Sequence, residues 1–293
     1  MKYAFETSHL NKKNLARLEI INSVIEEYQE QGYKLTLRQL YYQLVSRNII
    51  ANIDTEYGAL SRLLTKGRMG GIVDWDAIED RTRQPYIPYW VENIPDAIND
   101  TVKSYRLNRQ EGQENYIEVW CEKDAISNVL KRVTQHYHIH LMVNRGYSSC
   151  SAMYDAYNRI VCHVDQRLYI LYLGDHDPSG LDMIRDVTER LMRFGLFDID
   201  VRHIAITKEQ IEEYNPPPNP AKLSDTRAAN YIVEHGNVSW EVDAIRPDVL
   251  HQIVTDNIEE LVDMDLFNEM IEKEERDKEE LTDFVKGYKD KEG

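Results

Sequence analysis

The chain has 293 residues, 42% of them hydrophobic, and a formal net charge of −16. This length predicts two domains, each large enough to bury its own core. No apolar run reaches the length of a membrane span, and the first residues lack the apolar core of a signal peptide. The three cysteines show no C-x-x-C spacing, which is typical of reduced thiols. We therefore expect a cytoplasmic protein without membrane contact.

The negative charge is distributed unevenly along the chain. Residues 1–110 hold 15 Lys and Arg against 14 Asp and Glu, whereas residues 111–293 hold 20 against 37. Much of the acid lies in the tail 259–292, where mixed charges are typical of a solvated helix face. The first part of the chain could therefore still bind a polyanion.

The first 88 residues are predicted to form a winged helix-turn-helix domain. Apolar periodicity indicates helices over 14–31, 36–48 and 55–66, and the glycines from Gly67 onward are expected to end the third. Thr36–Gln39 reads as a capping box at the start of the second helix. Residues 70–75 could then form a small wing, which completes the DNA-binding arrangement.

Basic residues gather on the third helix and just after it. A basic recognition helix would contact DNA phosphates, while a solvated helix face explains the same charges equally well. The candidate DNA contacts are Arg62, Lys66, Arg68, Arg81 and Arg83.

An α/β domain is predicted to follow a connecting helix and linker over 89–115. Within 116–206, four apolar strands alternate with three amphipathic helices, which is typical of a parallel sheet. The expected strands are 116–121, 139–143, 168–173 and 198–206, and the expected helices are 124–136, 151–164 and 179–194. Residues 207–293 are expected to be a mostly helical C-terminal extension with an acidic tail.

Carboxylates follow two of these strands. Asp175 and Asp177 come just after strand 168–173, and Glu122 comes just after strand 116–121. Neighbouring parallel strands would bring them to one edge of the sheet, where binding sites gather and where hard oxygen ligands suit Mg²⁺ or Mn²⁺. Each acid also has a structural explanation, because Asp177 before Pro178 is a good helix N-cap and Glu122 suits a first helical turn.

The pattern of Glu122 with Asp175-His176-Asp177 resembles the Toprim domain of topoisomerases, primases and some nucleases. Wider stretches are similar to the A subunit of topoisomerase VI and its meiotic double-strand-break relative. They are Cys121–Ile126, Arg145–Tyr147, Gly174–Gly180, Ile206–Tyr214 and Trp240–Ala244. The resemblance covers roughly residues 35–263. It implies a Toprim fold over 116–206 and Mg²⁺ or Mn²⁺ bound by Glu122, Asp175 and Asp177.

The resemblance also implies a tyrosine nucleophile in the winged helix. The family's Arg-x-x-Tyr-Tyr pattern matches Arg38 to Tyr42, and the second tyrosine attacks DNA. A helical wheel independently places Tyr41 on the apolar stripe and Tyr42 on the face of Arg38, one turn earlier. We expect a packing role for Tyr41. We expect the Arg38 cation to favour the phenolate of Tyr42.

The function implied is metal-dependent DNA cleavage by tyrosine transesterification, as in the A subunit of a type IIB topoisomerase. The resemblance implies DNA as the partner and a homodimer in which the tyrosine of one subunit meets the metal of the other. It allows a separate ATPase subunit of the B type, whereas the chain itself lacks a Walker motif. Arg145 is a weaker candidate for the scissile phosphate. Two alternatives stay open: a Toprim nuclease that needs no tyrosine, and a non-catalytic DNA-binding module.

Overall fold

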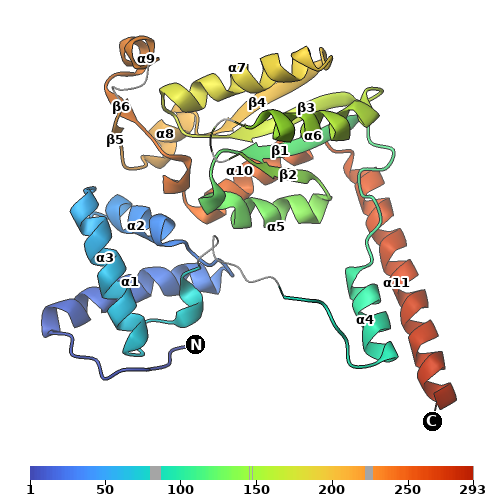
Figure 1. Ribbon diagram of the computed structural model, residues 1–293, viewed down its shortest axis with the longest axis horizontal. Coiled ribbons are helices and arrows are strands. Elements are labelled where there is room, and N and C mark those ends of the chain that lie inside the picture. Colours follow the sequence, from blue (N-terminus) through green and yellow to red (C-terminus); the bar gives the residue numbers. More distant parts are fainter. Residues whose placement is uncertain (80–86, 145, 147, 222–226, 293) are drawn as a thin grey trace.

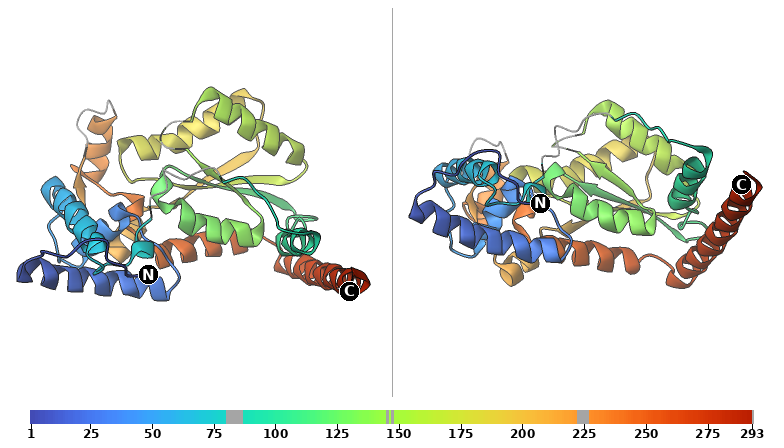
Figure 2. Two further views of the ribbon diagram at one scale, coloured as in Figure 1. Left: turned by 60° about the horizontal axis from the view of Figure 1, so that its bottom comes forward. Right: turned by 90° about the horizontal axis from the view of Figure 1, so that it is seen from below.

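The computed structural model describes residues 1–79, 87–144, 146, 148–221 and 227–292. The protein is a mixed α/β molecule, with a group of N-terminal helices beside a four-stranded sheet (Figure 1). A long C-terminal helix extends away from the sheet on the opposite side, as both views of Figure 2 show. In the described part of the chain, no helix is long and apolar enough to cross a membrane.

The N-terminal helices are α1 (Lys12–Glu30), α2 (Leu37–Ser46) and α3 (Asp54–Met69). The helix α1, capped by Asn11, begins two residues before the predicted start at residue 14. The predicted capping box between Thr36 and Gln39 is present at the start of α2. The helix α3 continues three residues beyond the predicted end at Lys66, and its C-cap is Gly70, one of the glycines expected to end it.

The predicted wing is not seen as a strand pair in the described residues. Residues 70–79 contain a 3₁₀ helix over Trp75–Ala77 and isolated bridges from Gly70 to Ala4 and from Ile78 to Leu35. A short 3₁₀ turn forms here because Asp74 accepts a hydrogen bond from the backbone of Asp76. Three helices are therefore established for this region, and the winged-helix assignment stays a prediction.

The sheet contains β1 (Asn115–Cys121), β2 (His140–Val143), β3 (Arg167–Leu173) and β4 (Ile199–Ala205). All neighbours are parallel in the order β2-β1-β3-β4, as the alternation of elements predicts. Because β1 and β3 pair directly, the residues that follow them meet at one edge.

Helices cover both faces of the sheet (Figure 1). Side chains such as Trp120 and Tyr172 pack with α6 (Cys150–Ile160) and α7 (Pro178–Arg193), and their neighbours Val119 and Leu171 pack on the other face. That second face is covered by α5 (Ser127–Tyr137) and α10 (Pro247–Glu259). Strands buried on both faces explain the unbroken apolar run in β3.

The C-terminal extension is mostly helical, as predicted, and also contains two short strands. Between α8 (Lys208–Tyr214) and α10 it forms β5 (Asn219–Pro220), α9 (Ala228–His235) and β6 (Val238–Ser239). The antiparallel β5–β6 ribbon lies at the end of the sheet that faces α2 (Figure 1). Beyond α10, the long helix α11 (Met264–Glu292) lies beside α4 (Ile94–Ser104).

Candidate metal centre

Three carboxylates converge at the carboxyl edge of the sheet. Asp175 follows β3, whereas Glu241 and Asp243 follow β6. One oxygen from each lies within 4.8 Å of the others, a spacing that could hold a metal ion. Hard oxygen ligands of this kind suit Mg²⁺ or Mn²⁺.

Backbone pairing brings the two segments together. His176 and Trp240 exchange backbone hydrogen bonds of 2.8 and 3.1 Å, which aligns the chain after β3 with the chain after β6. Asp175 Oδ1 then accepts a hydrogen bond of 2.9 Å from the backbone of Val242. Because Glu241 and Asp243 flank Val242, both carboxylates lie next to Asp175.

The start of α7 requires a glycine close to this centre. A Cβ atom on Gly180 would lie 2.2 Å from the carbonyl oxygen of Asp175, which is too close for any other residue. Gly180 therefore allows the first turn of α7 to pack directly against the backbone of Asp175.

The ammonium group of Lys123 lies among the three carboxylates. Its Nζ is 2.8 Å from Asp175, 2.5 Å from Glu241 and 3.0 Å from Asp243. Burial acts to lower the pKa of Lys123, but the attraction of Asp243, Asp175 and Glu241 outweighs it, so the pKa is raised. The lysine stays charged and already serves as a cation for the cluster.

Burial and the neighbouring acids act on the carboxylates themselves. Burial raises the pKa of Asp175 to about 7, with Lys123 acting in the opposite direction and Glu122 reinforcing the rise. Asp243 is fully buried, and its Oδ2 makes no hydrogen bond to the described residues although it lies 3.0 Å from Arg38 Nε. A buried carboxylate oxygen with unused lone pairs is a fitting metal ligand.

Arg38 and Tyr42 reach this cluster from α2. Arg38 forms ion pairs with Asp243 and Glu241, and its NH2 group lies 3.4 Å from the phenol oxygen of Tyr42. The guanidinium also sits over the Tyr42 ring, 5.6 Å from its centroid. Arg38 therefore links the candidate nucleophile to two of the three acids within a single chain.

The prediction that Arg38 makes the phenolate of Tyr42 form readily was wrong, because other features of the Tyr42 environment outweigh Arg38. Burial raises the pKa of Tyr42 to about 12, and Glu241 adds to the rise, while Arg38 opposes it without prevailing. Only 4% of the residue is exposed. At neutral pH, Tyr42 is therefore a protonated phenol in this arrangement.

The other predicted ligands, Glu122 and Asp177, lie close to Asp175 with different contacts. Glu122 Oε2 is 3.4 Å from the backbone nitrogen of Asp175, so the predicted meeting of the two strand ends is confirmed. Asp177 caps α7, and its Oδ1 accepts hydrogen bonds from Gly180 N and Ser179 Oγ at 2.7 and 2.9 Å. Metal binding by these two residues stays a prediction.

The predicted DNA contacts differ in their surroundings. Arg62 and Lys66 lie exposed on α3. Arg68 instead donates hydrogen bonds to the carbonyl oxygens of Trp75 and Ile78 at 2.6 and 2.7 Å, which braces the turn after α3. The remaining candidates, Arg81, Arg83 and Arg145, lie outside the described residues.

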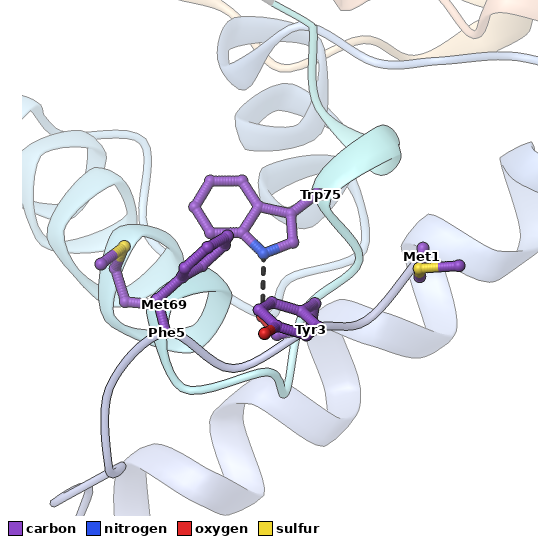
Figure 3. Close-up of a pocket in the computed structure, with 5 residues that line it drawn as sticks. All are labelled: Met1, Tyr3, Phe5, Met69 and Trp75. Carbon is purple, nitrogen blue, oxygen red and sulfur yellow. Dashed lines mark hydrogen bonds between the residues drawn. The ribbon is translucent and has the colours of Figure 1, made fainter.

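An apolar cavity of about 540 Å³, shallow and open to solvent, lies away from the acidic centre. Figure 3 shows its lining by Met1, Tyr3, Phe5, Met69 and Trp75, with Trp75 Nε1 donating a 2.9 Å hydrogen bond to the carbonyl oxygen of Tyr3. These residues supply no carboxylate or basic side chain. We interpret this cavity as a result of how the N-terminal segment packs against the end of α3 and the turn that follows it.

Sequence reasoning missed Lys123, Glu241 and Asp243 as members of the centre. Their signal was present in two stretches of the resemblance, Cys121–Ile126 and Trp240–Ala244. Glu241 and Asp243 also repeat the one-residue spacing of Asp175 and Asp177. Their approach depends on pairing between segments about 65 residues apart, which local patterns do not reveal.

A scan of the chain against models of known protein families found no match, and neither did a search of curated proteins.

Proposed function

We propose that this protein cleaves DNA by attack of Tyr42 on a phosphodiester, with the acidic centre binding a divalent metal ion, as in the A subunit of topoisomerase VI. The observation that carries the proposal is the position of Arg38, which contacts Tyr42 on one side and Glu241 and Asp243 on the other. A nucleophile and a metal-type carboxylate cluster are thereby adjacent. This juxtaposition is what transesterification of a phosphodiester needs.

The chemical step is a balanced exchange of esters. The Tyr42 phenol oxygen forms a bond to phosphorus, the bond from phosphorus to one sugar oxygen breaks, and the phenol proton is transferred in net terms to that sugar oxygen. The product is a phosphotyrosine that joins protein to DNA. We propose that the phosphate draws Arg38, whose side chain is 44% exposed, away from the carboxylates and toward itself.

The metal site would use Asp175, Glu241 and Asp243, with Glu122 next to Asp175. A bound Mg²⁺ or Mn²⁺ would neutralise charge on the phosphate and stabilise the leaving oxygen. The three carboxylates repel a phosphate group. The positive charges of Lys123 and Arg38 offset this repulsion and make the approach of a phosphate favourable.

One observation favours a second candidate, a metal-dependent nuclease that works without the tyrosine. Tyr42 is buried and its pKa is about 12, so its phenol is a poor nucleophile until it loses its proton. In that case the acidic centre would act on a water molecule and Tyr42 would only pack. The nuclease and the transesterase share Asp175 and differ in Tyr42.

The deciding experiment incubates the full chain with plasmid DNA and Mn²⁺, denatures it, and measures both strand breaks and DNA-linked protein. We expect Tyr42→Phe to abolish the adducts while leaving the fold intact, because it removes only a hydroxyl. We expect Asp175→Asn to abolish both signals. Tyr89→Phe, a change at an exposed tyrosine, is the matched control and should behave as the parent.

Three other outcomes would overturn the proposal. Breaks at the parental rate in Tyr42→Phe, but none in Asp175→Asn, would establish the nuclease. DNA binding without any breaks in the parent would establish a non-catalytic DNA-binding module. Adducts that persist in Tyr42→Phe would place the nucleophile at another residue.

A further inference from the structure

A directed chain of hydrogen bonds connects the two adjacent tyrosines of α2. The nearest acceptor for the Tyr41 hydroxyl is Asn52 Oδ1, at 3.0 Å, with the carbonyl oxygens of Ile53 and Ala51 at 3.3 and 3.4 Å. Asn52 Nδ2 donates to Asn219 Oδ1 at 2.9 Å. Asn219 Nδ2 then donates to the phenol oxygen of Tyr42 at 3.3 Å. The side-chain amides of Asn52 and Asn219 therefore each accept a hydrogen bond through the oxygen and donate one through the nitrogen.

The direction of this series of hydrogen bonds is fixed by neighbouring oxygen atoms that can only accept a hydrogen bond. Asn52 Nδ2 also lies 2.9 Å from the carbonyl oxygen of Pro218, so the nitrogen of Asn52 must face the Pro218–Asn219 segment. Asn219 Nδ2 also faces the carboxylate of Glu241, at 3.5 Å. Reversing either amide would place two oxygens against each other.

The fold holds Asn219 between the nucleophile and the acidic centre. Asn219 belongs to β5, which pairs with β6 through Asn219 and Ser239. The chain that leaves β6 reaches Glu241 two residues later. One ribbon therefore carries both the amide that contacts Tyr42 and a carboxylate of the centre.

We propose that Asn219, oriented by Asn52 and Tyr41, is a positioning residue that holds the phenol oxygen of Tyr42 toward the acidic centre. This inference rests on the function proposed above. It gives the Tyr41 hydroxyl a role beyond the packing that the apolar stripe predicts. A donor at this oxygen also stabilises the negative charge that develops as the phenol proton leaves.

The proposal is tested with Asn219→Asp, which keeps the shape of the side chain and replaces the donor by an acceptor. Tyr41→Phe is the second variant, because it removes only the hydroxyl at the far end of the chain. Tyr57→Phe, whose ring packs against Tyr41, and Tyr89→Phe, at an exposed tyrosine, are the matched controls.

The first measurement is NMR of the full chain carrying ¹³C at the tyrosine Cζ, with the Tyr42 signal identified from Tyr42→Phe. The Cζ shift reports on hydrogen bonds to the phenol oxygen, so Asn219→Asp and Tyr41→Phe should move the Tyr42 signal. The controls should leave it in place. This measurement does not depend on any reaction.

The second measurement is the rate of DNA-linked adduct formation at saturating DNA, together with DNA affinity and the midpoint of thermal unfolding. We expect Asn219→Asp to slow adduct formation by about 10- to 100-fold, the range for a hydrogen bond to a developing charge. Tyr41→Phe should slow it by about threefold to tenfold, since it acts through two intermediates. DNA affinity should not change in either variant.

The outcomes separate this inference from the proposed function. An unmoved Tyr42 signal and a rate within twofold of the parent in both variants would overturn the positioning role. A slower rate that is matched by an equal loss of folded protein would also overturn it, because the role would then be only structural. If the parent protein forms no adduct, the proposed function is overturned, and with it the catalytic role of Asn219. The NMR signal would still show whether Asn219 donates a hydrogen bond to Tyr42.

Discussion

At the scale of single residues, Lys123 occupies the position among the carboxylates that a divalent ion would take. Its ammonium group contacts all three members of the cluster within 3.0 Å. Three carboxylates so close together repel one another unless a cation lies between them. Lys123 therefore stabilises the centre without metal, and a metal ion must displace its ammonium group to bind the same oxygens.

We predict that Lys123→Met makes the metal-free protein less stable and increases its stabilisation by metal. Removing a partner from a buried ion pair costs about 3 kcal/mol, because the remaining charges are left uncompensated. A metal ion that binds the folded state restores this stability and no longer competes with an ammonium group. Thermal unfolding with and without Mn²⁺ measures both effects.

Lys131→Met is the control for this prediction, because Lys131 is an exposed lysine on α5. Its unfolding midpoint and its response to Mn²⁺ should match those of the parent. If Mn²⁺ stabilised Lys123→Met no more than it stabilises the parent, Lys123 and the metal would not share a site.

At the scale of elements, Gly67 lets α3 approach α1 and the turn that follows. A Cβ atom at Gly67 would lie 2.8 Å from Val73 Cγ2 and 3.0 Å from Leu18 Cδ1. Gly67→Ala should therefore destabilise the protein by about 1–3 kcal/mol through overpacking, although alanine is the better helix former. Chemical denaturation measures the free energy of unfolding.

Gly58 offers a matched control in the same helix. A Cβ atom there would meet only the guanidinium tip of Arg62, at 3.3 Å, which is free to move. Gly58→Ala should stabilise the protein by about 0.5–1 kcal/mol, the difference in helix propensity. Equal effects at both positions would show that close packing at Gly67 does not matter.

The long helix α11 is attached through Glu274, which is almost fully buried. Its carboxylate accepts hydrogen bonds from the backbone of Leu107, from Arg109 and from Lys278. Burial acts to raise the pKa of Glu274, but the bonds from Lys278 and Arg109 outweigh it and hold the pKa at about 2. The carboxylate thus joins α11 to the linker before β1.

We predict that acid weakens this attachment. A depressed pKa means that the contribution of Glu274 to stability is complete above its unfolded pKa of about 4.3 and is lost as the pH falls toward 2. The protection factors of the α11 amides, which correct for the pH dependence of intrinsic exchange, should fall over this range and should already be low in Glu274→Gln at neutral pH. Glu279→Gln is the control at an exposed acid of the same helix. Exchange that is equally slow in Glu274→Gln and the parent would contradict the prediction.

The elements that could be predicted are those determined by the pattern of neighbouring residues in the sequence. The strands and helices of 116–206 follow from apolar periodicity and differ from the structure by a few residues at their ends. The capping box of α2 and the N-cap role of Asp177 depend on neighbours within one turn, so the sequence reveals them. The meeting of Glu122 with Asp175 follows because β1 and β3 are adjacent parallel strands.

The parts that were not predictable depend on contacts between distant segments. Gly67 looks like a helix end, since only the packing of α1 shows why α3 continues through it. Glu241 and Asp243 join Asp175 only through the pairing of His176 with Trp240. The raised pKa of Tyr42 likewise depends on burial against residues that are remote in the sequence.

At the scale of the whole molecule, the N-terminal helices and the sheet share one hydrophobic cluster. It extends from Leu18 on α1 and Tyr42 on α2 to Val119 on β1 and Val254 on α10. Burial of this continuous apolar surface fixes α2 against the end of the sheet. Arg38 and Tyr42 therefore face the acidic centre of their own chain, whereas the resemblance implies a site shared by two subunits.

The last prediction distinguishes these two arrangements. Tyr42→Phe and Asp175→Asn proteins are mixed, denatured and refolded together so that any homodimer exchanges subunits, and DNA-linked adducts are then measured. If each site is built within one chain, every site carries a lesion and no adducts form. If the tyrosine of one subunit meets the acids of the other, one site in each mixed dimer has both intact parts and about a quarter of all sites recover, as random pairing requires. Because Arg38 and Asn219 connect Tyr42 to Glu241 within one chain, we expect no recovery. Adducts in the mixture, absent from either variant alone, would show instead that α2 leaves its own acidic centre and acts on that of a partner.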